Sequence, residues 1–284
     1  MRPSLFSAVG ADLAYVRWNI SPIILDLGLL SLRWYSLLFM TGIFISYQIV
    51  RQQFRRAKLP DRTFEAFVMY VLVGMILGMR LGHFLFYEPQ VFLERPLEIL
   101  LPFSNSPKIR FTGYQALTSH GGALGILISL WLFVRKYPTV STWFLLDQLA
   151  LVAPLAGAFI RLGNLFNSEM IGHPTTVPWA FVFPSFDLIP RHPTQIYEAS
   201  GYLLVFVILL AWKQQKKPYS PGVLFSLLLV LLFSVRFIVE FFKINQVPFE
   251  DGLILNMGQL LSLPFIVIGV VLFYYRRKNL VAAN

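Results

Sequence analysis

The sequence has no cysteine among its 284 residues. This absence excludes disulfide bonds, thiolate metal sites and a cysteine nucleophile, and it leaves the redox compartment open. Charged residues are also scarce, at 13% against about 25% in a typical soluble protein. Because 56% of the residues are hydrophobic and the mean hydropathy is +0.64, the composition excludes a water-soluble globular protein.

Several catalytic motifs are missing as well. The sequence has no Walker loop, no His-Glu-x-x-His helix, no Gly-x-Ser-x-Gly turn and no histidine cluster at metal-ligand spacing. We therefore expect no metal and no cofactor. The formal net charge of +10 is explained by basic loops that flank membrane spans, so nucleic-acid binding is not required.

Long apolar runs are what the sequence does contain. A helix that crosses the bilayer core needs about 20 mostly apolar residues. Such windows cover residues 32–50, 64–87, 117–134, 143–160, 194–212, 222–242 and 257–275. The sequence therefore predicts one all-α polytopic integral membrane domain, residues 1–284, with about seven transmembrane helices and the termini on opposite sides.

The basic residues concentrate in alternate loops, which by the positive-inside rule face the cytoplasm. These residues are Arg51, Arg55, Arg56, Lys58, Arg62, Arg135, Lys136, Lys213, Lys216, Lys217, Arg276, Arg277 and Lys278. We therefore expect the N-terminus outside and the C-terminus in the cytoplasm. Residues 1–30 are expected to form an external arm rather than a cleaved signal peptide, with 22–32 lying along the membrane surface.

Ionisable side chains inside membrane spans are costly, so each is a functional hypothesis. The densest stretch holds Arg161, Asn164, Asn167 and Glu169 and ends at Gly172. A guanidinium suits a phosphate, and amides can bind phosphate oxygens or a glycerol hydroxyl. A polar loop without a ligand is the alternative interpretation.

His120 begins the third window and precedes Gly121 and Gly122, which leave the imidazole accessible. A histidine there can take or give a proton near neutral pH. The alternative is a structural histidine beside glycines that allow close helix packing.

Two further groups lie near the same face of the membrane. Arg236 and Glu240 are four residues apart, so they share a helix face and can form an ion pair, either structural or functional. At the start of the fifth window, helix capping explains Pro193 and Thr194 but not His192, Gln195 and Glu198 together. Tyr35 lies near the start of the first window, and it is a candidate only because these other polar groups are expected near the same face of the membrane.

Taken in order, these residues resemble the bacterial prolipoprotein diacylglyceryl transferases. The resemblance runs from about residue 23 to residue 275. It is carried by Arg33-Trp34-Tyr35, Gly78-Met-Arg80-Leu-Gly82-His83, Phe86-Tyr87, His120-Gly121-Gly122, Arg161-x-Gly163-Asn164-x-x-Asn167-x-Glu169, Arg191-His192-Pro193-x-Gln195-x-Tyr197-Glu198, Arg236-x-x-x-Glu240-Phe-Phe and Met257-Gly258-Gln259-x-Leu261-Ser262. One departure is Ile160, where the family commonly has glycine.

The resemblance implies an enzyme of the bacterial inner membrane with its active site toward the external leaflet. It would move the diacylglyceryl group of phosphatidylglycerol to the lipobox cysteine thiol of a prolipoprotein signal peptide, release glycerol 1-phosphate, and have membrane lipids as its surroundings. The nucleophile then belongs to the substrate, which is compatible with a chain that lacks cysteine.

Roles for the candidate residues follow as hypotheses. His120, Arg161 and Arg236 are the catalytic candidates. The substrate-binding candidates are Arg161, Tyr35, Asn164, Asn167, Glu169, Gly172, His192, Gln195 and Glu240. His120 would take the thiol proton, the arginines would stabilise the leaving phosphate, and Glu240 would orient Arg236. In the alternative mechanism an arginine-polarised phosphate oxygen takes the proton and His120 only orients the substrate.

A membrane lipid or anion transporter is the competing function, because intramembrane arginines also line transport paths. The sequence shows no paired broken helices and no two matching halves, which transporters often have. Thioether formation on a lipobox peptide distinguishes the enzyme from the transporter.

Overall fold

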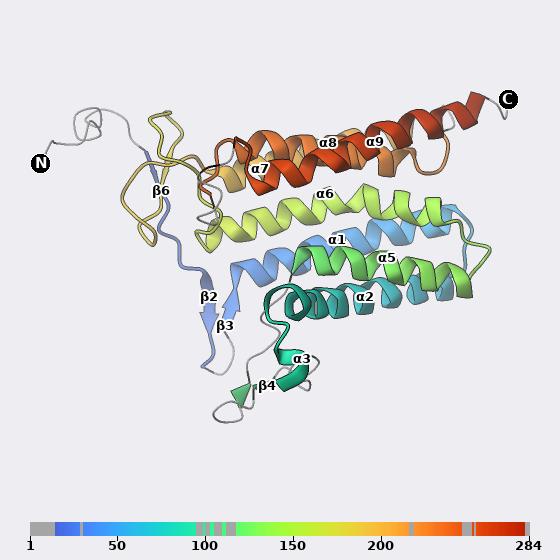
Figure 1. Cartoon of the computed structure of the whole chain (residues 1–284), viewed down its shortest axis with the longest axis horizontal. Helices are drawn as coiled ribbons and strands as arrows, with labels where there is room; N and C mark the ends of the chain where they lie inside the picture. Colours follow the sequence, from blue (N-terminus) through green and yellow to red (C-terminus); the bar gives the residue numbers. More distant parts are fainter. Residues whose placement is uncertain are drawn as a thin grey trace, which may run out of the picture. The chain divides into compact units, whose positions relative to one another are not determined.

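The computed structural model describes residues 15–28, 31–94, 99, 103–104, 110–111, 118–215, 219–245, 252 and 254–281 and is mostly helical (Figure 1). Within these residues, five helices are long and apolar enough to cross a membrane. They are α2 (Asp61–Tyr87), α6 (Thr142–Phe166), α7 (Thr194–Gln214), α8 (Val223–Glu240) and α9 (Met257–Val281). The prediction of a helical membrane protein is confirmed at this level.

The other two predicted windows also coincide with helices, α1 (Trp34–Arg56) and α5 (Ser119–Lys136). Both end in basic residues, Arg55 and Arg56 in α1 and Arg135 and Lys136 in α5. Cations are favourable in a last helical turn, where backbone carbonyls carry partial negative charge. A single turn, α3 (Val91–Glu94), follows α2.

Short strands interrupt the predicted all-α pattern. Strand β1 (Val16–Arg17) pairs in parallel with β6 (Phe181–Val182), and β4 (Phe103–Ser104) pairs with β5 (Arg110–Phe111). Strands β2 (Ile23–Asp26) and β3 (Ser31–Arg33) form an antiparallel pair directly before α1. The stretch expected to lie along the membrane surface therefore has its own hydrogen-bonded structure, while residues 1–14 of the predicted arm lie outside the described residues.

The chain divides into two compact units. Unit 1 comprises Met1–Ile49 and Leu146–Asn284. In it α7, α8 and α9 run side by side (Figure 1). A buried apolar cluster joins α6, α7 and α8 through Ala150, Leu151, Val205, Leu209, Leu224 and Leu228. This cluster holds the three helices together through their apolar side chains. The polar residues at the ends of the same helices form the site.

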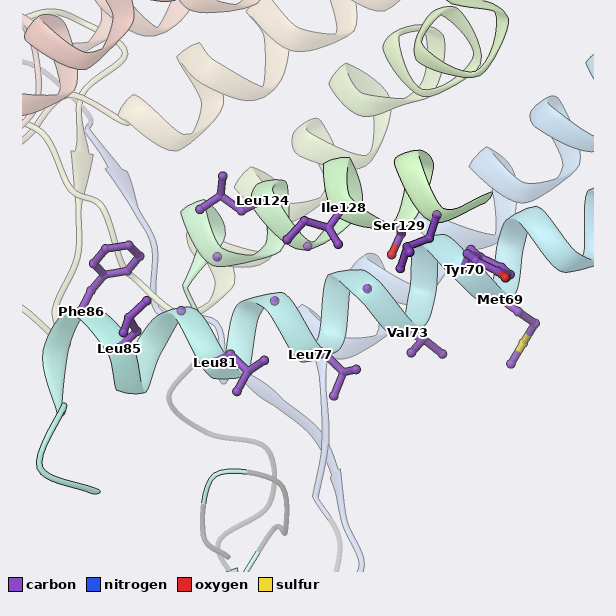
Figure 2. A pocket seen from close by; sticks show the side chains of 16 residues that line it. Met69, Tyr70, Val73, Leu77, Leu81, Leu85, Phe86, Leu124, Ile128 and Ser129 are labelled. Atoms are coloured by element: carbon purple, nitrogen blue, oxygen red, sulfur yellow. The ribbon is translucent and has the colours of Figure 1, made fainter. Parts of the chain in front are cut away.

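Unit 2 comprises Val50–Leu145, and α2 packs against α5 within it. A Cβ on Gly78 would lie 2.3 Å from the carbonyl oxygen of Gly121, and one on Gly125 would lie 2.0 Å from that of Gly74. Small residues at this spacing let two membrane helices approach to backbone contact. Beside the contact is an apolar groove of about 600 Å³, with Leu77 and Leu81 of α2 and Leu124 of α5 among its lining residues (Figure 2).

Candidate active site

Glu198 is the centre of a buried group of charges in unit 1. It lies in the second turn of α7 and its side chain is 0% exposed. Its Oε2 lies 2.9 Å from Nε of Arg161 in α6, and its Oε1 lies 3.1 Å from Nζ of Lys243, just after α8. The hydroxyl of Tyr202, one turn further along α7, donates to Oε1 at 3.2 Å. One carboxylate thus holds two cations from two other segments, which compensates much of the cost of burying them.

The start of α7 is tied to the segment after α6, which places Glu198 beside Arg161. Gln195 donates from Nε2 to the carbonyl oxygen of Glu169, and Thr194 donates from Oγ1 to that of Met170. Both side chains are fully buried. Pro193 precedes the first residue of α7, where its missing N–H costs no helical hydrogen bond.

A chain of hydrogen bonds extends from Arg161 along the predicted polar stretch. Nη1 of Arg161 donates to Oδ1 of Asn164 at 3.3 Å, and Nδ2 of Asn164 donates to Oε2 of Glu169 at 3.0 Å. Nδ2 of Asn167 donates to the other oxygen of Glu169, also at 3.0 Å. The hydrogen bond to Asn164 uses one N–H group of Arg161, and a guanidinium has five.

Tyr35, in the first turn of α1, belongs to the same site. A Cβ on Gly163 of α6 would lie 2.7 Å from the ring of Tyr35, so the glycine lets this ring lie against the helix. Glu169 and Arg161 are both within electrostatic range of its hydroxyl. The sequence motif Arg161-x-Gly163-Asn164 therefore combines two hydrogen-bonding groups with the one residue small enough to admit the tyrosine.

The predicted ion pair between Arg236 and Glu240 does not form. Glu240 instead pairs through Oε2 with Lys243 at 3.0 Å, and its other oxygen faces Gly258 at the start of α9, where a Cβ would lie 1.8 Å away. Within the described residues Arg236 makes no ion pair, although it is within electrostatic range of Tyr202. The physical reason is that Lys243, three residues after Glu240, is held in place by backbone pairing and competes successfully for the carboxylate.

Gly172 lies where three segments of unit 1 meet. A Cβ at this position would be 2.5 Å from the carbonyl oxygen of His192 and 2.7 Å from that of Phe242. Gly172 N donates to the first of these oxygens at 3.1 Å, and His173 N donates to the second at 2.8 Å. Any side chain here would separate the segments that carry His192 and Lys243.

His192 faces an aromatic group. Its Nδ1 lies 3.1 Å from the hydroxyl of Tyr197, which also accepts a hydrogen bond from Nε1 of Trp179 at 2.8 Å. The ring of Phe242 lies edge-on, 5.0 Å away between centroids. Burial, and secondly the nearby His173, lower the pKa of His192 below its ordinary value, so its imidazole is neutral at pH 7 and can accept or donate a hydrogen bond there.

Unit 1 therefore brings together all the predicted site residues except His120. His120 lies in the first turn of α5, in unit 2, and its side chain is exposed. Gly121 and Gly122 follow it in α5, and Gly121 is in backbone contact with α2.

Two residues of the charge cluster were missed by sequence reasoning, and a third was given no role. Neither Lys243 nor Tyr202 was singled out as a candidate. Glu198 was recognised in its motif without a function. The signals were present: Tyr202 is four residues after Glu198 on one helix face, and Lys243 is three residues after Glu240. No group of metal-binding side chains occurs in the described part of the chain.

Comparison with known proteins agrees with the resemblance drawn from the motifs. Residues 22–275 match the family model of prolipoprotein diacylglyceryl transferase. A phosphatidylglycerol–prolipoprotein diacylglyceryl transferase of Bacteroides fragilis is 44% identical over 268 residues, which cover 93% of this chain and 96% of the relative. Enzymes of the same name from Tolumonas auensis and Porphyromonas gingivalis are 41% and 40% identical, over 92% and 94% of this chain and 98% and 96% of their own lengths. The chain therefore belongs to the prolipoprotein diacylglyceryl transferase family.

Proposed function

We propose that the protein transfers the diacylglyceryl group from phosphatidylglycerol to the lipobox cysteine thiol of prolipoproteins. The observation that carries this proposal is the ordered polar cluster around Arg161 in a chain that matches the family over residues 22–275. Phosphatidylglycerol and prolipoprotein are the substrates in the relatives' names. A partly buried guanidinium held by a carboxylate and flanked by amides is suited to a phosphodiester with a hydroxylated headgroup.

In the proposed reaction the cysteine thiolate attacks the glyceryl carbon that carries the phosphate ester. The new C–S bond forms as the C–O bond to phosphate breaks, and glycerol 1-phosphate leaves with the electron pair. Arg161 and Arg236 stabilise the negative charge on the phosphate as it departs. Glu198 fixes the guanidinium of Arg161 through Nε, so the remaining N–H groups can be directed at the phosphate.

The other site residues position the lipid headgroup and the peptide. Asn164, Asn167 and Glu169 form one hydrogen-bonded row, which can exchange partners with glycerol hydroxyls. The substrate-binding set also includes Tyr35, His192 and Gln195. Gly172 keeps the backbone segments of the site close together, and Glu240 contributes to its balance of charge.

His120 is proposed as the base that takes the thiol proton, because the thiolate is the nucleophilic form. The competing mechanism gives this proton to a phosphate oxygen. Replacement of His120 by glutamine decides between them: the histidine mechanism requires turnover to fall by roughly 10²–10⁴-fold with lipid binding retained. Near-normal turnover in a folded His120→Gln protein would assign the proton to the phosphate.

We further propose seven spans, including α1 and α5, with the N-terminus outside and the C-terminus in the cytoplasm. The cytoplasmic loops would then be those rich in Arg and Lys, and the ends of α6 and α8 that carry the site would face the external leaflet of the bacterial inner membrane. Labelling of single cysteines introduced into this cysteine-free chain tests the orientation loop by loop.

The primary test is mass spectrometry of a lipobox peptide incubated with the purified protein and phosphatidylglycerol. We expect a diacylglyceryl mass on the cysteine, and its loss in Arg161→Ala. Arg277→Ala is the matched control, because Arg277 is exposed in the last part of α9. A folded wild-type protein that forms no adduct but moves phospholipid between leaflets would instead be a lipid transporter.

A further inference from the structure

We infer that Lys243 is a positioning residue: it balances the charges of Glu198 and Glu240 and thereby keeps Arg161 available to a phosphate anion. This inference rests on the proposed function, because the anion is the phosphate of the lipid substrate. It adds a residue that was not a candidate in the sequence.

The ammonium of Lys243 lies between two carboxylates and away from solvent. Nζ is 3.0 Å from Oε2 of Glu240 and 3.1 Å from Oε1 of Glu198, and the lysine side chain is 4% exposed. The carboxylates are 7% and 0% exposed. An ammonium so enclosed acts on substrate through its neighbours and not by direct contact.

The charge balance around Arg161 depends on this ammonium. With Lys243 charged, Glu198 and Glu240 face two cations, Arg161 and Lys243. With Lys243 removed, two buried carboxylates would face Arg161, and both lie within electrostatic range of its guanidinium. An incoming phosphate would then meet an excess of negative charge, which is poorly screened in a site of low dielectric constant.

Backbone pairing holds the main chain of Lys243 beside Gly172. Ile244 N donates to the carbonyl oxygen of Ile171 at 3.3 Å, and His173 N donates to that of Phe242 at 2.8 Å. Gly172 and Lys243 are thus bridged as neighbouring residues of two antiparallel segments. The segment that follows the Arg161 motif therefore holds the main chain of Lys243, and two ion pairs hold its ammonium beside the carboxylate that pairs with Arg161.

The test compares steady-state kinetics of Lys243→Met with the wild type, using phosphatidylglycerol in mixed micelles and a lipobox peptide. We expect KM for phosphatidylglycerol to rise at least about tenfold, because anion binding is what the excess negative charge opposes. Lys243→Arg keeps the charge and should stay within about threefold of wild type. The exposed Lys278→Met is the matched control and should change nothing.

A double variant separates charge balance from a purely structural role. In Glu240→Gln/Lys243→Met one negative charge is removed together with the positive one, which restores the wild-type balance of charge, so KM should return most of the way to that of the wild type. If the double variant is as impaired as Lys243→Met, or if folded Lys243→Met has an unchanged KM, the inference is wrong.

Binding measurements keep this inference distinguishable from the proposed function. If the wild type forms no thioether, the proposed function fails, and equilibrium binding of phosphatidylglycerol vesicles to the wild type and Lys243→Met then decides. Weaker binding by the variant supports the role of Lys243 in receiving an anion. Equal binding overturns it.

Discussion

Replacement of Asp147 by alanine is expected to destabilise unit 1, far from any assigned chemistry. Asp147 lies in α6 with its side chain 3% exposed, and its two oxygens accept hydrogen bonds at the start of α8. Oδ2 accepts from Gly222 N at 2.7 Å, and Oδ1 accepts from Phe225 N at 2.9 Å. A carboxylate at this position also compensates the partial positive charge of a helix N-terminus.

The magnitude follows from the two donors that alanine would leave unsatisfied. Each buried N–H without a partner costs about 1–3 kcal/mol, so Asp147→Ala should lower the free energy of unfolding by roughly 2–6 kcal/mol. Asp147→Asn retains one carbonyl acceptor and should lose about half as much. Asp61→Ala is the control, because the pair of Asp61 with Arg55 is more than half exposed and contributes about 0–1 kcal/mol.

The assay is denaturant or thermal unfolding in one detergent, with transferase activity measured on the folded fraction. We expect the order wild type, Asp61→Ala, Asp147→Asn, Asp147→Ala from most to least stable. If Asp147→Ala unfolds together with Asp61→Ala, the cross-helix cap contributes nothing and the reasoning is refuted.

Two further predictions concern the loop between α6 and α7 and the helix pair of unit 2. Hydrogen bonds from Arg191 lower the pKa of Asp187, so the stability that this carboxylate contributes is complete above its ordinary pKa of about 3.9 and is lost as the pH falls through the lower folded value. The stability difference between wild type and Asp187→Asn should therefore be constant from pH 5 to pH 8 and shrink below about pH 4; a difference that persists at pH 2 would contradict this. Gly78→Ala should lower the unfolding temperature and disrupt the pairing of α2 with α5, because its Cβ would meet the backbone of Gly121 at 2.3 Å. Gly252→Ala, whose Cβ would meet no described atom within 4 Å, should unfold like the wild type, and equal effects of the two changes would refute the packing argument.

The sequence predicted the helices well because lipid solvation leaves a strong signal: an apolar run of the right length between charges. The second window was placed at 64–87 and the helix is Asp61–Tyr87, since polar residues of a first helical turn do not register in hydropathy. The first window was placed from 32, whereas α1 begins at Trp34 because residues Ser31–Arg33 form β3. Hydropathy cannot distinguish a short extended segment from an apolar helix end, since pairing with β2 is a contact with another part of the chain.

The local part of the site was predictable for a similar reason. Arg161 and Asn164 are three residues apart, so helical spacing already indicated that they interact, and Glu169 follows closely after the end of α6. The pairing of Arg236 with Glu240 satisfied the same rule and was wrong. Four-residue spacing permits a contact but does not choose between competing cations, and here Lys243 wins because a second chain segment holds it in place.

Gly172 shows how the local and the tertiary parts of the site depend on each other. It was predicted to bind substrate, and that role stays a prediction. The structure shows that glycine is needed here for packing, because no side chain fits between the carbonyl oxygens of His192 and Phe242. The two segments held against it carry His192 before α7 and Lys243 after α8. Lys243 then meets Glu198, and Glu198 holds Arg161. Gly172, which has no side chain, thus determines the distance between the polar stretch that the sequence predicted and Lys243, which it did not predict. Lys243 was missed because its position depends on the close approach of three backbone segments, and such an approach leaves no periodic pattern in the sequence.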